Sequence, residues 1–86
     1  MRVVVLTKER TDYARDVETF LGDFRRVTGR ELEVIDPESP AGVSFCQAYG
    51  IWDFPIIVAI SDDGQMQQQW RGLPLPTINE LSYYNQ

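Results

Sequence analysis

The sequence predicts a single α/β domain with a four-stranded mixed sheet and helices on both of its faces. Two short runs, residues 3–6 and 56–60, are continuously apolar and rich in β-branched side chains, which is typical of strands buried on both faces. Between residues 13 and 27, apolar side chains recur every three or four positions, the period of an amphipathic helix. Because 86 residues leave room for one hydrophobic core, we expect one domain over residues 1–86.

The first strand and the first helix are predicted from these patterns. Residues 3–6 form the strand, and the helix that follows begins at Thr11, a residue type suited to capping a helix N-terminus. Asp12 would lie in the first turn, and Gly29 would end the helix in the left-handed conformation. The apolar face of this helix consists of Tyr13, Val17, Phe20, Leu21, Phe24 and Val27.

A second strand and a second helix follow. Residues 32–35 form the strand. Ser39 and Pro40 start the helix. Proline is tolerated there because it lacks a backbone N–H, and the N–H groups of the first helical turn have no partner within the helix. The helix is expected to run to about Tyr49, where Gly50 can adopt the left-handed conformation that ends it.

The last part of the chain predicts a hairpin and a third helix. The apolar run at residues 56–60 is expected at the centre of the sheet, and a turn at residues 61–64 leads into an antiparallel return over residues 66–70. The final helix, residues 77–84, would bury Ile78, Leu81 and one of the terminal tyrosines. The order is β-α-β-α-β-β-α, in which the first three elements form a right-handed parallel unit.

The charge pattern argues against nucleic-acid binding. The formal net charge is −5, and the densest basic group, Arg25, Arg26 and Arg30, is interleaved with acidic residues. A phosphate-binding surface needs clustered positive charge, so we expect no nucleic-acid partner. The chain has no histidine, which removes histidine-based catalysis and imidazole ligands, and we expect no metal site.

The sequence gives no sign of a membrane or a secreted location. The apolar run at residues 3–6 is far shorter than the hydrophobic region of a signal peptide, and no stretch approaches the ~20 apolar residues of a membrane span. The single cysteine, Cys46, cannot form an intramolecular disulfide and therefore implies no oxidising compartment. We expect a cytoplasmic protein that does not associate with membranes.

Residues 49–55 read Tyr-Gly-Ile-Trp-Asp-Phe-Pro and are followed by the apolar strand. This segment resembles the Tyr-Gly-(Ile/Val)-x-x-(Ile/Val/Phe)-Pro segment of thioredoxins. Residues 62–64, Asp-Asp-Gly, fit the hairpin turn of that family, and Gly72 fits the glycine after its last strand. The resemblance to the thioredoxin-like superfamily covers nearly the whole chain. It implies a thioredoxin-like fold with a cis peptide bond before Pro55, beside the place of the family's active cysteines.

Residues 7–15, Thr-Lys-Glu-Arg-Thr-Asp-Tyr-Ala-Arg, resemble the glutaredoxin segment Thr-Lys-x-x-Cys-Pro-Tyr-Cys-Arg. Aligned without gaps, the two cysteine positions of the CxxC motif fall on Thr11 and Ala14. Thiol–disulfide exchange needs a thiolate, whereas Thr11 offers a hydroxyl that no histidine can activate. The chain therefore lacks the CxxC motif, and we expect no catalytic residue there and no enzymatic activity of the family's kind.

Glutathione binding in glutaredoxins uses a Thr-Val-Pro segment and a later Gly-Gly-x-Asp turn. Here Asp53, Phe54 and Pro55 replace the first segment, and the second has no counterpart. Lys8 alone matches a glutathione-contacting position. We expect no cofactor.

Cys46 is expected to be buried and inert. It occupies a place where thioredoxin-like sequences often carry a small apolar residue, and a buried free cysteine behaves as a small hydrophobe. A reactive cysteine would need exposure and nearby positive charge. The alternative function that this residue keeps open is a thiol–disulfide redox protein acting through Cys46.

Trp52 and Phe54 flank the expected cis-proline loop. Relatives with this fold dock an extended peptide at this edge by backbone pairing, and exposed aromatic side chains are typical anchors of such partners. Alternatively, Phe54 belongs to the core and Trp52 partly covers the place of the missing cysteines. The sequence leaves both interpretations open.

These observations favour a redox-inactive domain that binds a protein or peptide through the loop of Trp52, Asp53, Phe54 and Pro55. A further alternative is a structural subunit of an oligomer, with an edge strand or the terminal residues Tyr83 and Tyr84 in the interface. The partner and the oligomeric state are not predicted.

Overall fold

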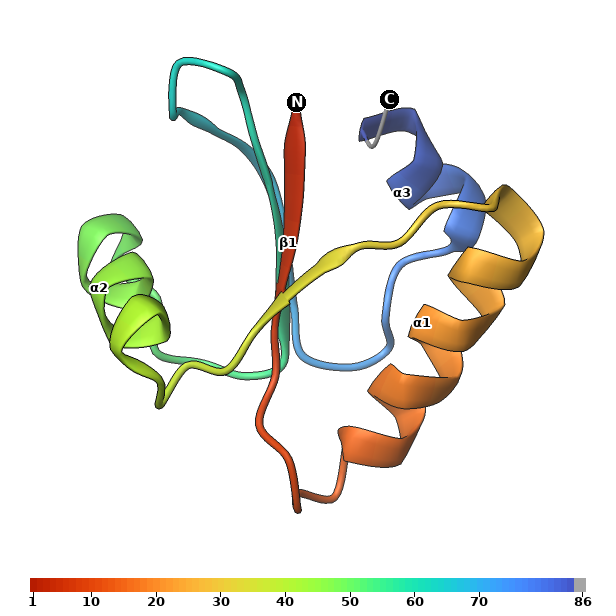
Figure 1. The fold of residues 1–86 in the computed structure, drawn as a ribbon, viewed down its shortest axis with the longest axis horizontal. Coiled ribbons are helices and arrows are strands. Elements are labelled where there is room, and N and C mark those ends of the chain that lie inside the picture. The colour runs from red at the N-terminus through yellow and green to blue at the C-terminus, as the bar shows by residue number, and fades with distance from the viewer. Residues whose placement is uncertain (85–86) are drawn as a thin grey trace.

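The computed structural model describes residues 1–84, and its elements follow the predicted order (Figure 1). They are β1 (Arg2–Leu6), α1 (Ala14–Thr28), β2 (Glu33–Ile35), α2 (Pro40–Tyr49), β3 (Ile56–Ile60), β4 (Met66–Arg71) and α3 (Ile78–Tyr84). Among these helices, none is long and apolar enough to cross a membrane.

The strands form the predicted four-stranded mixed sheet, in the order β2-β1-β3-β4. β1 pairs with β2 in parallel and with β3 in antiparallel orientation, and β3 forms an antiparallel hairpin with β4. Every residue of β3 is buried, as are residues 3–6 of β1. The two continuously apolar runs are therefore the central pair of strands, as predicted, and β2 and β4 are the edges.

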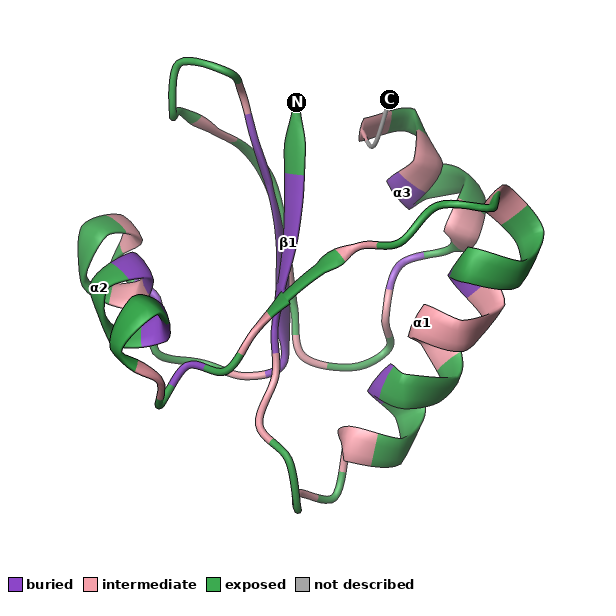
Figure 2. Cartoon of the chain, in the orientation of Figure 1, coloured by how far each residue is buried: buried purple, intermediate pink, exposed green. Residues whose placement is uncertain are grey.

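Helices cover both faces of this sheet, as predicted (Figure 1). Because side chains alternate along a strand, Val3 and Val5 pack on the side of α1 and α3, whereas Val4 and Leu6 pack on the side of α2. The buried residues gather on the central strands and on the helix faces turned toward them (Figure 2). The hydrophobic core thus has two halves, one on each face of the sheet.

Helix α2 begins and ends as predicted. The Oγ of Ser39 accepts a hydrogen bond of 3.0 Å from the N–H of Gly42, and Pro40 occupies the first turn. Gly50 has a φ of 66°, the left-handed conformation that ends the helix. Gly29 ends α1 in the same way, with a φ of 73°.

The predicted start of α1 is wrong. The helix begins at Ala14 with Tyr13 at the N-cap position, and Thr11 caps nothing. The hydroxyl of Thr11 donates instead to the carbonyl of Lys8 at 3.0 Å, because a threonine side chain can bond to nearby backbone as readily as to a helix end. The parallel ladder of β2 begins at Glu33, one residue after the predicted start of that strand.

Helix α3 closes the half of the core that contains α1. Leu81 is fully buried, and Ile78 and Tyr84 pack against the same cluster while partly exposed. Tyr83 is 71% exposed. The predicted burial is therefore confirmed for Leu81, whereas Ile78 and Tyr84 face the core without being fully buried.

Gly42 and Gly22 lie inside helices in opposite surroundings. A Cβ at Gly42 would lie 1.9 Å from the carbonyl oxygen of Asp36, whereas a Cβ at Gly22 would meet no atom within 4 Å. We expect Gly42→Ala to lower the free energy of unfolding by about 2–3 kcal/mol, because the backbone clash outweighs the helix preference of alanine. Gly22→Ala is expected to raise it by about 1 kcal/mol.

Denaturant unfolding of the two variants beside the unaltered protein measures both changes. Gly22→Ala is the matched control, since it makes the same chemical change within a helix. A Gly42→Ala variant as stable as the unaltered protein would show that the close approach of α2 to Asp36 is absent.

Candidate functional site

Two loops meet at one end of the sheet. The last pair of the central ladder is Leu6 with Ile56, so the chain that leaves β1 lies beside the chain that enters β3. The ammonium of Lys8 lies 5.2 Å from the centre of the Phe54 ring, a cation–π contact that joins the two loops. The Phe54–Pro55 peptide bond is cis, and the carbonyl of Pro55 accepts a 2.8 Å hydrogen bond from the N–H of Gly72.

A pocket of about 400 Å³ opens between α2 and the loop of residues 50–55. Its apolar lining comes from both sides: Val43 and Cys46 from the helix, and Ile51, Trp52 and Phe54 from the loop. Lys8 and Glu38 also line it, with 3.7 Å between the ammonium nitrogen and a carboxylate oxygen. A mainly apolar pocket with a few charged groups is typical of binding sites.

The structure brings together two of the four residues predicted for the binding loop. Trp52, 74% exposed, and Phe54, partly buried, both line the pocket. Asp53 turns to the end of β4, where its carboxylate lies 3.6 Å from the guanidinium of Arg71. Pro55 is buried.

The positions aligned with the family's cysteines do not line this pocket. Thr11 is tied to the carbonyl of Lys8, and Ala14 lines a smaller hollow of about 160 Å³ on the α1 side of the sheet. The N–H of Ala14 donates to the carbonyl of Thr11 at 3.2 Å, so the two residues are the ends of one tight turn. They are close to one another, as the alignment requires.

Sequence reasoning missed Val43 as part of this pocket. Its side chain is 43% exposed although it is apolar, and it precedes Cys46 by three residues on α2. Residues three apart share a helix face, so the apolar pair of Val43 and Cys46 at this spacing was the signal that could have found it.

Cys46 is partly exposed, so the expectation of full burial is wrong. Helix α2 directs Phe45 into the core. Cys46 is the next residue along the helix, so its side chain lies at the edge of the buried face. The thiol has lost enough water contact that burial raises its pKa. A thiol with a raised pKa is mostly protonated near neutral pH, which makes it a poor nucleophile.

The described residues hold no group of three or more histidine, cysteine or acidic side chains able to bind a metal ion. The pocket offers apolar contact from Trp52, Val43 and Phe54, and Lys8 and Glu38 are its charged groups.

No family model matches the sequence, and no curated protein matches it. Among solved structures, the chain is similar to thioredoxin 1 from the thermophilic eubacterium Thermosipho africanus, with a TM-score of 0.65. The fold is thioredoxin-like. The match covers 99% of this chain and 90% of that thioredoxin at 10% sequence identity, so it confirms the fold that the sequence resemblance implied. At this identity the likeness concerns the thioredoxin-like fold alone.

Cys46 is expected to react slowly in the native protein. Its partial burial limits access, and its raised pKa lowers the fraction of thiolate at neutral pH, so we expect a thiol reagent at pH 7 to react about tenfold more slowly than with the unfolded chain. The rate should rise as the pH is raised through the range where the thiol ionises. Free cysteine measured in the same two solvents corrects for the denaturant, and equal corrected rates would show a reactive thiol.

Proposed function

We propose that this domain is a redox-inactive binding module that holds a protein or peptide segment at the loop of Trp52, Asp53, Phe54 and Pro55. The observation that carries the proposal is the exposure of Trp52, 74% of whose surface is open beside an apolar pocket of about 400 Å³. A large aromatic side chain at the edge of an apolar pocket is the type of residue that contributes most binding energy in protein interfaces.

The backbone of the loop supports an extended partner. The hydrogen bonds found among residues 1–84 include none to the backbone N–H or carbonyl of Phe54. A segment passing along the loop can pair with these groups, while one of its side chains enters the pocket between Trp52 and Val43. Backbone pairing contributes affinity, and the pocket selects the side chain.

The absence of redox activity rests on the residues at the start of α1. Thr11 and Ala14 stand where the family's thiols would be, and neither supplies a thiolate. The remaining thiol, Cys46, lines the pocket, and this contact is what favours the rival function of a redox protein. Its raised pKa argues against that rival. We assign the domain to the cytoplasm, since a single cysteine needs no oxidising compartment.

Trp52→Ala tests the binding surface. The immobilised domain is used to retain proteins from a lysate of the source organism. We expect the variant to bind these proteins at least about tenfold more weakly, because truncating a central aromatic anchor costs about 2 kcal/mol or more. Tyr83→Ala is the matched control: Tyr83 is 71% exposed but lies on α3, away from the pocket. Quantitative mass spectrometry of retained proteins gives the comparison, and equal losses in both variants would contradict the assignment.

A double variant, Thr11→Cys with Ala14→Cys, tests the proposed loss of redox function. The 3.2 Å hydrogen bond between the two residues closes a four-residue turn, whose ends lie within about 7 Å, so their thiols can reach one another. Under mild oxidation we expect an intramolecular disulfide, detected by mass after alkylation of the remaining thiols.

The single variants serve as controls for pairing with Cys46. The unaltered protein is expected to show no disulfide reductase activity. A folded double variant that never closes the bond would mean that the alignment of residues 7–15 is wrong, and reductase activity in the unaltered protein would contradict the redox-inactive function.

A further inference from the structure

The outer edge of β2 has unpaired backbone groups. The ladder pairs Val5 with Val34 and Leu6 with Ile35, and the carbonyl of Ile35 accepts from the N–H of Thr7 at 3.4 Å. Backbone groups of alternate residues in a strand point to the same side, so those of Val34 point away from β1. The edge therefore presents an N–H and a carbonyl to which a further strand can bond.

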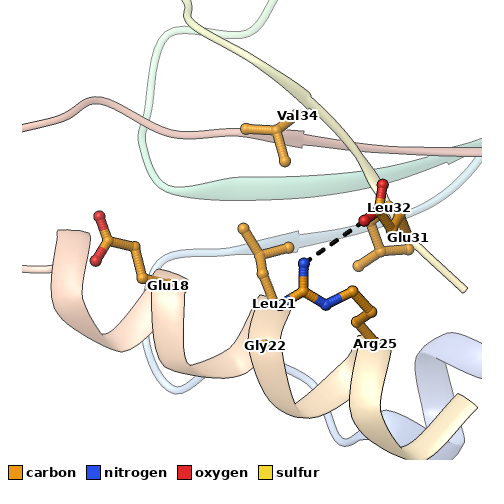
Figure 3. A pocket seen from close by; sticks show the side chains of 7 residues that line it. All are labelled: Glu18, Leu21, Gly22, Arg25, Glu31, Leu32 and Val34. Atoms are coloured by element: carbon orange, nitrogen blue, oxygen red, sulfur yellow. Dashed lines mark ion pairs between the residues drawn. The ribbon is translucent and has the colours of Figure 1, made fainter. Parts of the chain in front are cut away.

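A hollow of about 340 Å³ lies below this edge, between β2 and α1 (Figure 3). Its apolar part consists of Leu21, Leu32 and Val34, and Val34 is 49% exposed although it pairs with a residue of the core. Gly22 adds free space, because a Cβ at this position would meet no atom within 4 Å. A strand beside β2 would lie about 4.8 Å away and place every second side chain over this hollow.

The charged groups at the two ends of the hollow differ (Figure 3). At one end, Arg25 and Glu31 form an ion pair of 3.6 Å. At the other end Glu18 is exposed, and within residues 1–84 no side chain pairs with it. An incoming strand with a lysine or arginine at this end would supply the missing partner.

The same charges disfavour a second copy of this chain as the occupant. Pairing two β2 edges would bring together two copies that each carry an exposed Glu18, unpaired within residues 1–84, and a formal net charge of −5. Like charges across neighbouring strands are destabilising, and charged edges are a common protection against self-pairing.

We propose that the edge of β2 binds an extended segment of another protein as a fifth strand. An apolar side chain of that segment fills the hollow over Leu21 and Gly22, and a basic side chain two or more positions along pairs with Glu18. This surface lies on the α1 side of the sheet, whereas the pocket of Trp52 lies on the α2 side. The inference is independent of the function proposed for that pocket.

The probe is a library of random linear peptides displayed on phage and selected on the immobilised, unaltered domain. The recovered peptides are synthesised, their affinities measured by calorimetry, and their site located by amide shifts in the ¹⁵N-labelled protein. We expect peptides that alternate apolar and polar residues and contain a lysine or arginine. Their largest shifts should fall on Leu21, Gly22 and Val34.

Two variants alter the hollow without touching the core. Gly22→Leu fills it with a residue that favours helix and should weaken the binding of these peptides about tenfold or more. Glu18→Lys reverses the free charge at one end of the hollow and should weaken their binding about fivefold, the upper range for an exposed ion pair. Asp16→Lys makes the same change of charge on an exposed position of α1 that does not line the hollow, and should leave the affinity unchanged. Trp52→Ala should also leave it unchanged.

Recovery of no binding peptide would overturn the proposal, as would peptides whose shifts cluster around Trp52. Peptides that bind Glu18→Lys and the unaltered domain equally well would overturn it even if Gly22→Leu failed to fold. Self-association of the unaltered domain in sedimentation, abolished by Gly22→Leu, would assign the edge to a second copy and also contradict the proposal.

Discussion

The pairing of β1 with β3 is the constraint on which the rest of this structure depends. Both strands are apolar at nearly every position, so the pair cannot face water on either side. Each fully buried valine, leucine or isoleucine contributes about 1.5–3 kcal/mol, which makes these two strands the main source of stability in a chain of this size. Helices must then cover both faces, and the sequence between the strands supplies them.

This constraint also decides where the candidate site lies. After β1 the chain crosses to α1 on one face of the sheet. Before β3 it comes from α2 on the other face. Both crossings occur at the same end of the central pair, beside Leu6 and Ile56. Lys8 therefore lies over Phe54, and the pocket forms where the loop before β3 separates from α2. A site at this end follows from the topology, whichever side chains occupy it.

The spacing of apolar residues predicted the helices and strands well, because the residues that contact the core must be apolar. The apolar spacing of α1 and the continuous runs of β1 and β3 reflect contacts with a buried layer. The exception is Val27, which was predicted on the apolar face of α1 but is 64% exposed, because it lies in the last turn of the helix beyond the core. The start of α1 and the exposure of Cys46 were not predictable in this way. Thr11 has two competing backbone partners that the sequence cannot rank, and the exposure of Cys46 depends on how far one loop stands from α2.

The two surfaces proposed for partners have different chemistry, and that difference follows from their places in the sheet. The pocket of Trp52 adjoins the end of the central strands, so its lining is mainly the uncovered border of the core. The hollow beside β2 adjoins an edge strand, where exposed backbone groups would invite self-pairing if the flanking residues were apolar. The carboxylate of Glu18, unpaired within residues 1–84, opposes pairing with a second acidic copy, and the same carboxylate favours a basic partner. Because the sheet separates the two surfaces, an occupant of one leaves the other accessible, so the two proposed partners can be bound at the same time.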